Sequence, residues 1–125
     1  MNPYARQAKE YRYQEVMGAS PIGLIIIAYD ATIAACRLQD LEATSRALSA
    51  LRNSLNFEHP EIASKLFALY VWCGDLSRAG KWDEAAGILD DLRAVWVQAE
   101  QQMSVSRQAA AEPVFTAGQP PAPGL

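Results

Sequence analysis

The sequence contains few of the residues on which catalysis and metal binding depend. Its 125 residues include one histidine, His59, which directly precedes a proline, and two cysteines, Cys36 and Cys73, which have no Cys-x-x-Cys spacing. HExxH, GxGxxG and Walker motifs do not occur. An enzyme needs a nucleophile, a base and stabilising donors in convergent positions. We therefore expect no catalytic residue, no metal site and no cofactor. Both cysteines lie in apolar helical patterns and are interpreted as small buried hydrophobes.

Charge and hydropathy exclude further classes of protein. The net charge is −3, and no basic run or stripe is present, so nucleic acid is a poor candidate partner. The longest apolar run, from Pro21 to Cys36, is shorter than the roughly 20 residues of a membrane span and contains Asp30. The N-terminus has no apolar segment of the signal-peptide type. We expect a single cytoplasmic domain that does not insert into a membrane.

The hydrophobic pattern predicts an all-α fold, because no sustained alternation of the strand type occurs. Four long helices are expected, from residue 21 to about 39, 41 to 55, 60 to 79 and 82 to about 105. Asp40 is expected to cap the second helix, and Gly80 is expected to end the third. A short N-terminal helical or extended segment precedes them. The short connections favour an antiparallel up-down bundle. Residues 1–105 would form this bundle, and residues 106–125, rich in Ala, Gln and Pro, would form a disordered tail.

The first long helix has more apolar surface than one packing face requires. Ser20 and Pro21 are typical of a helix start. At about 100° per residue, one dense apolar face suits the bundle core, and a second apolar face lies roughly opposite. The residues of the core face are Ile22, Ile25, Ile26, Tyr29, Ile33 and Cys36. The residues of the second face are Leu24, Ile27, Ala31, Ala34 and Leu38. Either the chain itself buries this face, as in an ordinary central helix, or a partner covers it.

The third helix repeats this pattern. One stripe contains Ile62, Leu66, Leu69, Cys73 and Leu76, and another contains Phe67, Tyr70 and Val71. The candidate partner-binding residues from the two helices are Leu24, Ile27, Ala31, Leu38, Phe67 and Val71. Burial of each in the core is the alternative.

Several segments, in order along residues 2 to 102, resemble the flagellin export chaperone family. They are Asn2-Pro3-Tyr4, Tyr11, Ser20-Pro21-x-x-Leu24, Ala28-Tyr29-Asp30-Ala31-x-Ile33, Ser54-Leu55-Asn56-Phe57, Leu66-x-x-Leu69-Tyr70, Leu76, Ala79-Gly80 and Val95-Trp96-x-Gln98-Ala99. The chain departs from the family's Leu-Tyr-Asp-Gly at positions 28–31 and from its Tyr-Asp-Tyr-Met-like run at positions 70–73. These departures concern the shape of the groove more than the fold.

The resemblance implies a helical bundle without a cofactor. It also implies a cytoplasmic chaperone in bacterial flagellum assembly. Such a chaperone binds the disordered C-terminal segment of flagellin in apolar grooves, prevents premature polymerisation and keeps flagellin competent for flagellar type III export. By the same resemblance, Tyr4 and Tyr11 would lie in an N-terminal segment that covers part of the groove. An export-gate component of the secretion apparatus would be a further partner.

Other functions remain open on the sequence alone. The same apolar face could serve a weak homodimer, or an adaptor bundle with another helical partner. A tetratricopeptide-type adaptor, suggested by residues 80–85, would need about three stacked repeats, which this chain cannot supply. A small enzyme is disfavoured by the missing catalytic groups.

Overall fold

The computed structural model describes residues 17–118, with side chains described as far as residue 109. Within this part of the chain the structure is helical and no strand forms. Its long helices are α2 (Pro21–Arg37), α3 (Leu41–Asn53), α4 (Pro60–Arg78) and α5 (Trp82–Gly118). The predicted all-α fold class is confirmed. The predicted N-terminal segment, with Tyr4 and Tyr11, lies outside the described residues.

Local side chains determine where the helices begin. The hydroxyl of Ser20 accepts a hydrogen bond from the backbone N–H of Gly23 at 3.0 Å, and Pro21 occupies the first helical position. The carboxylate of Asp40 accepts from the backbone N–H of Ala43 at 3.0 Å, which begins α3. Both side chains satisfy N–H groups that have no partner inside the helix. The predicted helix starts at Ser20 and Asp40 are therefore confirmed.

Two residues with positive φ form the turns after α2 and α4. Gly80 has a φ of +77°, a conformation in which glycine avoids the clash of a Cβ atom. Gln39 has a φ of 55°, which is unusual for a residue with a side chain. The tight turn at Gln39 leaves the preceding residue, Leu38, 79% exposed at the end of α2.

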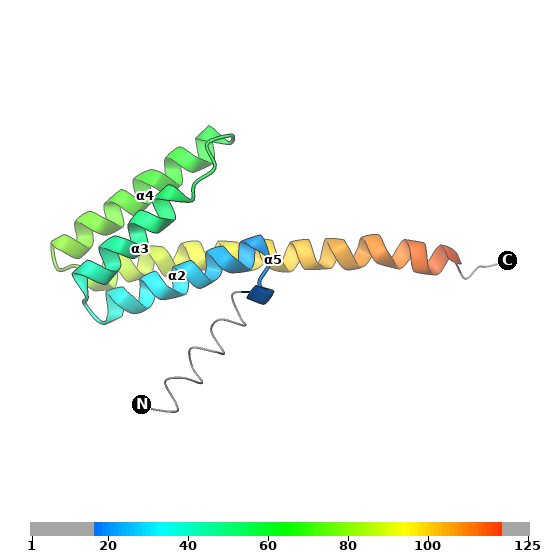
Figure 1. Ribbon diagram of the computed structural model, residues 1–125, viewed down its shortest axis with the longest axis horizontal. Helices are drawn as coiled ribbons and strands as arrows, with labels where there is room; N and C mark the ends of the chain where they lie inside the picture. Colours follow the sequence, from blue (N-terminus) through cyan, green and yellow to red (C-terminus); the bar gives the residue numbers. More distant parts are fainter. Residues whose placement is uncertain (1–16, 119–125) are drawn as a thin grey trace, which may run out of the picture.

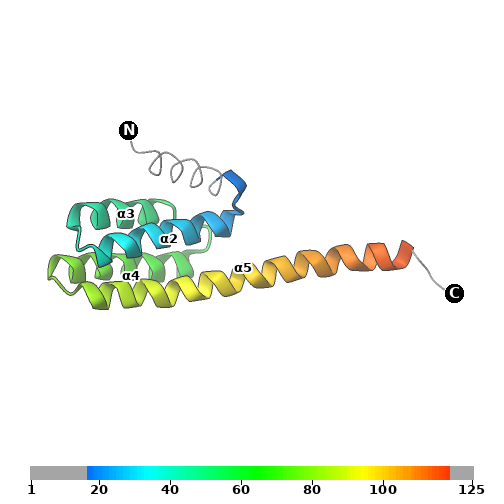
Figure 2. The ribbon, with the colours of Figure 1, turned by 90° about the horizontal axis from the view of Figure 1, so that it is seen from below.

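Each of the four helices packs mainly against two others, which makes a closed ring. The contacting pairs are α2 with α3, α3 with α4, α4 with α5, and α5 with α2. Figure 1 shows the α3–α4 pair inclined to the α2–α5 pair, whereas the helices appear nearly parallel in Figure 2. The inclination separates the pairs at the end that carries the α3–α4 connector. A helical bundle built from four helices accounts for most of the described residues.

The core centres on two tyrosines that meet across the bundle. The side chains of Tyr29 on α2 and Tyr70 on α4 are 0% and 2% exposed, and their hydroxyl oxygens lie 2.6 Å apart in a hydrogen bond in which either can donate. Their ring centroids are 6.1 Å apart in an edge-to-face arrangement. Trp96 of α5 lies 6.5 Å from Tyr29. This layer therefore joins three helices through aromatic packing and one satisfied polar pair.

Burial along α2 agrees only partly with the face assigned to the core. Tyr29, Ile33 and Cys36 are buried as expected, but Ile22 and Ile25 are only half-buried. Thr32, which the pattern does not place in the core, is 0% exposed. Its hydroxyl donates to the backbone carbonyl of Ala28 at 2.8 Å, so a polar side chain is buried without losing its hydrogen bond.

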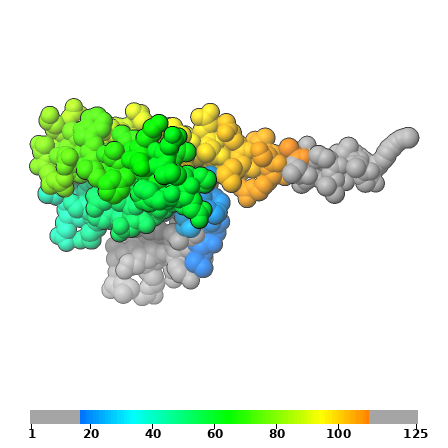
Figure 3. All heavy atoms as spheres, turned by 90° about the horizontal axis from the view of Figure 1, so that it is seen from above, coloured from blue at the N-terminus to red at the C-terminus, as the bar shows by residue number. Residues whose placement is uncertain are grey.

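α5 is longer than the sequence pattern predicts. A disordered tail is expected from residue 106, but the helix continues to Gly118. Composition accounts for the continuation through residues 106–112, which read Ser-Arg-Gln-Ala-Ala-Ala-Glu and contain strong helix formers without glycine or proline. The helix then passes through Pro113 before it ends at Gly118. Residues 101–109 are all exposed, and Figures 1 to 3 show this part of the helix extending past the bundle. Residues 119–125 lie outside the described part.

Among the described residues, no helix has the length and apolar composition needed to cross a lipid bilayer.

Both cysteines are buried free thiols, as predicted. Burial raises the pKa of the Cys73 thiol from 9.0 to about 11 and raises that of Cys36 as well. The hydroxyl of Thr44, also 0% exposed, has no hydrogen-bond partner within the described part of the chain. Desolvation disfavours the charged thiolate, so the folded state holds both thiols in the protonated form.

Stability should therefore fall in alkaline solution. The unfolded Cys73 ionises near its ordinary pKa, whereas the folded thiol does not, so the stabilisation is complete below pH 9 and is lost as pH rises toward 11. One such group lowers the free energy of unfolding by about 1.4 kcal/mol per pH unit in this window. Urea unfolding at pH 8 and pH 10 under reducing conditions measures the slope. Cys73→Ala should give a shallower slope, and an unchanged slope would contradict the assignment.

Candidate functional site

The outer face of α2 forms one side of a surface hollow of about 420 Å³, here called the α2 hollow. Its lining from α2 and the start of α3 consists of Ile27, Asp30, Ala31, Ala34, Ala35, Leu38, Asp40 and Ala43. Ile27 is half-buried at this surface, and Ala31 and Leu38 are exposed. Three of the predicted binding residues, Ile27, Ala31 and Leu38, are therefore brought together at one site.

The small size of the alanines explains the shape of the α2 hollow. Ala31 and Ala34 lie between the longer side chains of Ile27 and Leu38, and Ala43 faces them from α3. A methyl group at each of these positions leaves room that a longer side chain would fill. The hollow can thus accept apolar side chains from outside the bundle.

The other predicted binding residues lie elsewhere. Leu24 is 43% exposed on α2 but is not part of the lining of the α2 hollow. Phe67 is 44% exposed and Val71 is half-buried, both on α4, which packs on α3 and α5. The six predicted residues that the structure describes therefore belong to more than one surface. A partner that contacts all of them must extend around the bundle.

Ion pairs join α2 to α5 beside the α2 hollow. Arg93 donates two hydrogen bonds to the carboxylate of Asp30, and Arg37 donates to Asp90 at 2.8 Å. The hydrogen bond to Asp30 raises the pKa of Arg93. Because these side chains are largely exposed, each pair contributes at most about 1 kcal/mol to stability. Their main effect is to hold the α2 edge in place and to compensate the charge of Asp30.

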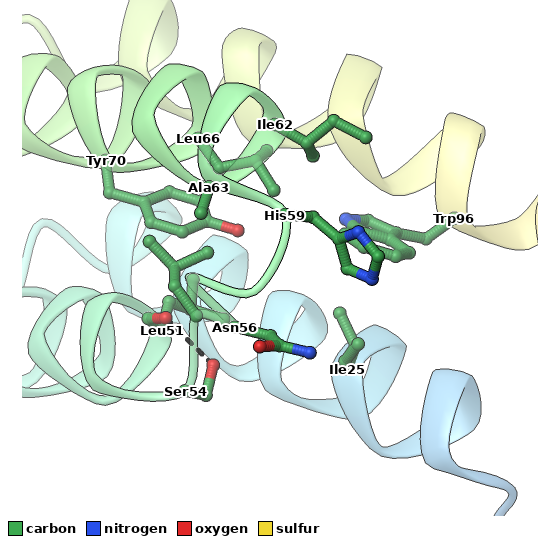
Figure 4. A pocket seen from close by; sticks show the side chains of 11 residues that line it. Ile25, Leu51, Ser54, Asn56, His59, Ile62, Ala63, Leu66, Tyr70 and Trp96 are labelled. Carbon is green, nitrogen blue, oxygen red and sulfur yellow. Dashed lines mark hydrogen bonds between the residues drawn. The ribbon is translucent and has the colours of Figure 1, made fainter.

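A second concavity, here called the end pocket, lies at the end of the bundle near the α3–α4 connector. It has a volume of about 290 Å³. The residues that line it are Ile25, Leu51, Ser54, Leu55, Asn56, His59, Ile62, Ala63, Leu66, Tyr70 and Trp96. Figure 4 shows Leu66 and Tyr70 on α4 facing the interior, with Trp96 opposite and His59 at the rim. Apolar side chains from all four long helices enclose it.

Sequence reasoning did not predict the end pocket. The sequence pattern places Leu66 in an apolar stripe of the third helix, and the structure directs this side chain into the end pocket. Periodicity along one helix does not indicate how far neighbouring helices diverge. The one available signal was the connector, in which Asn56 and His59 place polar groups beside apolar helix ends.

Other exposed apolar side chains were also missed as candidates. Trp72 on α4 is 53% exposed, Val95 on α5 is 62% exposed, and Phe57 in the α3–α4 connector is 55% exposed. None of them lines the α2 hollow. Val95 therefore offers a position for a control substitution outside the α2 hollow.

The described residues hold no group of three or more His, Cys, Asp or Glu side chains able to bind a metal ion. The chemistry that both concavities offer is apolar contact with a few hydrogen-bonding groups at the edge.

Comparison with protein-family models, with curated proteins and with solved structures finds no match to this chain.

Proposed function

We propose that this protein is a cytoplasmic export chaperone that binds the disordered C-terminal segment of flagellin. In this role it would prevent premature polymerisation and keep flagellin competent for flagellar type III export. The observation that carries the proposal is the α2 hollow, where the second apolar face of α2 remains accessible. Leu38 in this face is 79% exposed, and Ile27 and Ala31 line the same hollow. The sequence resemblance to the flagellin export chaperone family supports the choice of partner.

The proposed mode of binding is an amphipathic client helix laid against the bundle. Ordering a disordered segment costs about 2–5 kcal/mol, and burial of apolar surface returns about 25 cal/mol per Å². A single hollow offers too little area to offset that cost. The separation of Phe67 and Val71 from the α2 hollow favours a client that extends over more than one helix.

The proposal includes an up-down topology in which each helix runs antiparallel to its neighbours. The supporting observations are the short connections and the closed ring of contacts. This arrangement gives long parallel grooves between adjacent helices, which suits an extended client. In the proposed mechanism the protein acts as a passive clamp without nucleotide, cofactor or metal. An export-gate component of the secretion apparatus is the proposed second partner.

Calorimetric titration with a flagellin C-terminal peptide tests the proposal. We expect saturable binding at micromolar concentrations with a negative heat-capacity change, because apolar surface is buried. A scrambled peptide of the same composition is the control for nonspecific contact. Absence of binding by the native-order peptide, or equal binding by both, would contradict the proposal.

Self-association is the alternative use of the same apolar surface. The exposure of Leu38 and Leu24 would serve a homodimer or an adaptor function equally well. Light scattering of the purified protein separates these possibilities. A dimer mass that persists without peptide favours self-association, and a monomer mass that rises by one peptide favours the chaperone.

A further inference from the structure

We propose that the end pocket binds a small planar aromatic molecule of two fused rings that carries a neutral hydrogen-bond acceptor. This inference rests on the end pocket alone and is independent of the proposed function. An engineered apolar cavity of about 150 Å³ binds benzene. The end pocket, at about 290 Å³, has room for a second ring.

The walls of the end pocket suit a flat apolar ligand. Leu66 and Ile25 supply aliphatic contacts, and Tyr70 and Trp96 supply aromatic ones. Figure 4 shows these side chains directed toward the same space. Aromatic pairs in edge-to-face or offset geometry contribute about 0.5–1.5 kcal/mol beyond area burial. A fused-ring ligand would use both kinds of wall.

The rim of the end pocket includes two donor groups that have no protein partner among the described residues. The hydroxyl of Ser54 already donates to the carbonyl of Leu51 at 2.8 Å, and the side-chain oxygen of Asn56 accepts from the backbone N–H of Glu58 at 2.9 Å. The amide nitrogen of Asn56 has no partner among the described residues, and neither has the ring of His59. An amide nitrogen donates, and imidazole carries at least one N–H in every protonation state. Both side chains are exposed, so an acceptor on the ligand would replace the water that these donors otherwise bind.

The neighbouring charges favour a neutral acceptor over an anion. Glu58 and Glu61, both exposed and outside the lining of the end pocket, lie one and two residues from His59 along the chain. Their carboxylates would repel a negatively charged ligand group at the same rim. A carbonyl or amide oxygen accepts the available N–H groups without this repulsion.

Nuclear magnetic resonance titration of the full chain tests the proposal with three indole probes. Indole-3-carboxamide carries a neutral acceptor, 3-methylindole carries none, and indole-3-carboxylate carries a charged one. We expect saturable shifts at the methyl groups of Ile25 and Leu66 and at the indole of Trp96. The carboxamide should bind at least threefold more tightly than either other probe. Absence of saturation by the carboxamide at millimolar concentration, shifts confined to other residues, or equal affinity for all three probes would overturn the proposal.

Substitutions at the rim and in the wall separate the contribution of hydrogen bonding from that of apolar contact. Asn56→Ala removes a hydrogen-bond donor and should weaken binding of the carboxamide about fivefold. The affinity for 3-methylindole should change less than twofold. The matched control is Gln98→Ala, which removes an exposed amide on α5 outside the end pocket. This variant should leave the affinity for both probes unchanged. Leu66→Trp should fill the end pocket and weaken the binding of both probes more than tenfold.

A second wall variant tests the apolar contacts if Leu66→Trp does not fold. Ile62→Ala shortens an exposed side chain of the pocket lining and should weaken both probes about threefold with the helical signal unchanged. Unchanged affinity in Asn56→Ala together with unchanged affinity in either wall variant would show that the probes bind elsewhere.

Discussion

Replacing Tyr29 by alanine should lower the free energy of unfolding by about 3–5 kcal/mol, enough to unfold a marginally stable small bundle. The ring is 0% exposed and packs against Tyr70 and Trp96, so its removal leaves a cavity where three helices meet. The change also removes the hydrogen-bond partner of Tyr70. Urea unfolding followed by circular dichroism measures the loss.

Phenylalanine substitutions separate the packing from the hydrogen bond. Tyr29→Phe keeps the ring but leaves the buried hydroxyl of Tyr70 without its partner, which costs about 1–3 kcal/mol. The double variant Tyr29→Phe, Tyr70→Phe removes both hydroxyls and should be more stable than the Tyr29→Phe single variant. If the double variant loses as much free energy of unfolding as the two single variants together, the two hydroxyls do not act as a pair.

The Ile27→Asp substitution should weaken binding of the flagellin peptide about 30-fold, which corresponds to about 2 kcal/mol. The new carboxylate would stand in the α2 hollow, one turn from Ala31, and would have to lose water when the client docks. Calorimetric titration with the same peptide measures the effect. Circular dichroism must show that the helical signal is retained.

Two further variants make this test specific. Leu38→Asp changes a residue that is 79% exposed, so it should weaken binding while leaving stability within about 0.5 kcal/mol. Val95→Asp introduces the same charge at a 62% exposed position on α5, outside the α2 hollow, and should leave affinity unchanged. Equal losses in Ile27→Asp and Val95→Asp would mean that charge alone weakens binding, and would argue against the hollow as the docking site.

The fold class and the helix starts could be predicted because they depend on local chemistry. Ser20, Asp40 and Gly80 act on backbone groups within a few residues, and the sequence contains all the information needed to place them. The end of α5 could not be placed in this way. The Ala-rich stretch after residue 105 was interpreted as a loss of apolar content, whereas its helix propensity extends the helix.

The candidate site could be predicted only in part, for a geometric reason. The period of α2 identified the face that carries Ile27, Ala31 and Leu38, because these residues share one helix. Ala43 joins the lining of the α2 hollow only because of the way α3 packs on α2. The end pocket depends on the inclination between the two helix pairs. Both features depend on distances between helices, and the hydrophobic pattern of a single helix carries no information about those distances.

The projecting part of α5 affects how the mass of the protein must be measured. A helix of 37 residues is about 55 Å long, whereas α2, α3 and α4 have 13 to 19 residues and lengths of about 20–29 Å. The monomer is therefore rod-like at one end, and an elongated particle elutes early from a gel-filtration column. Elution volume calibrated with spherical standards would overstate its mass and imitate a dimer. Scattering intensity reports mass without reference to shape, and it is the readout that can separate a chaperone monomer from a self-associating bundle.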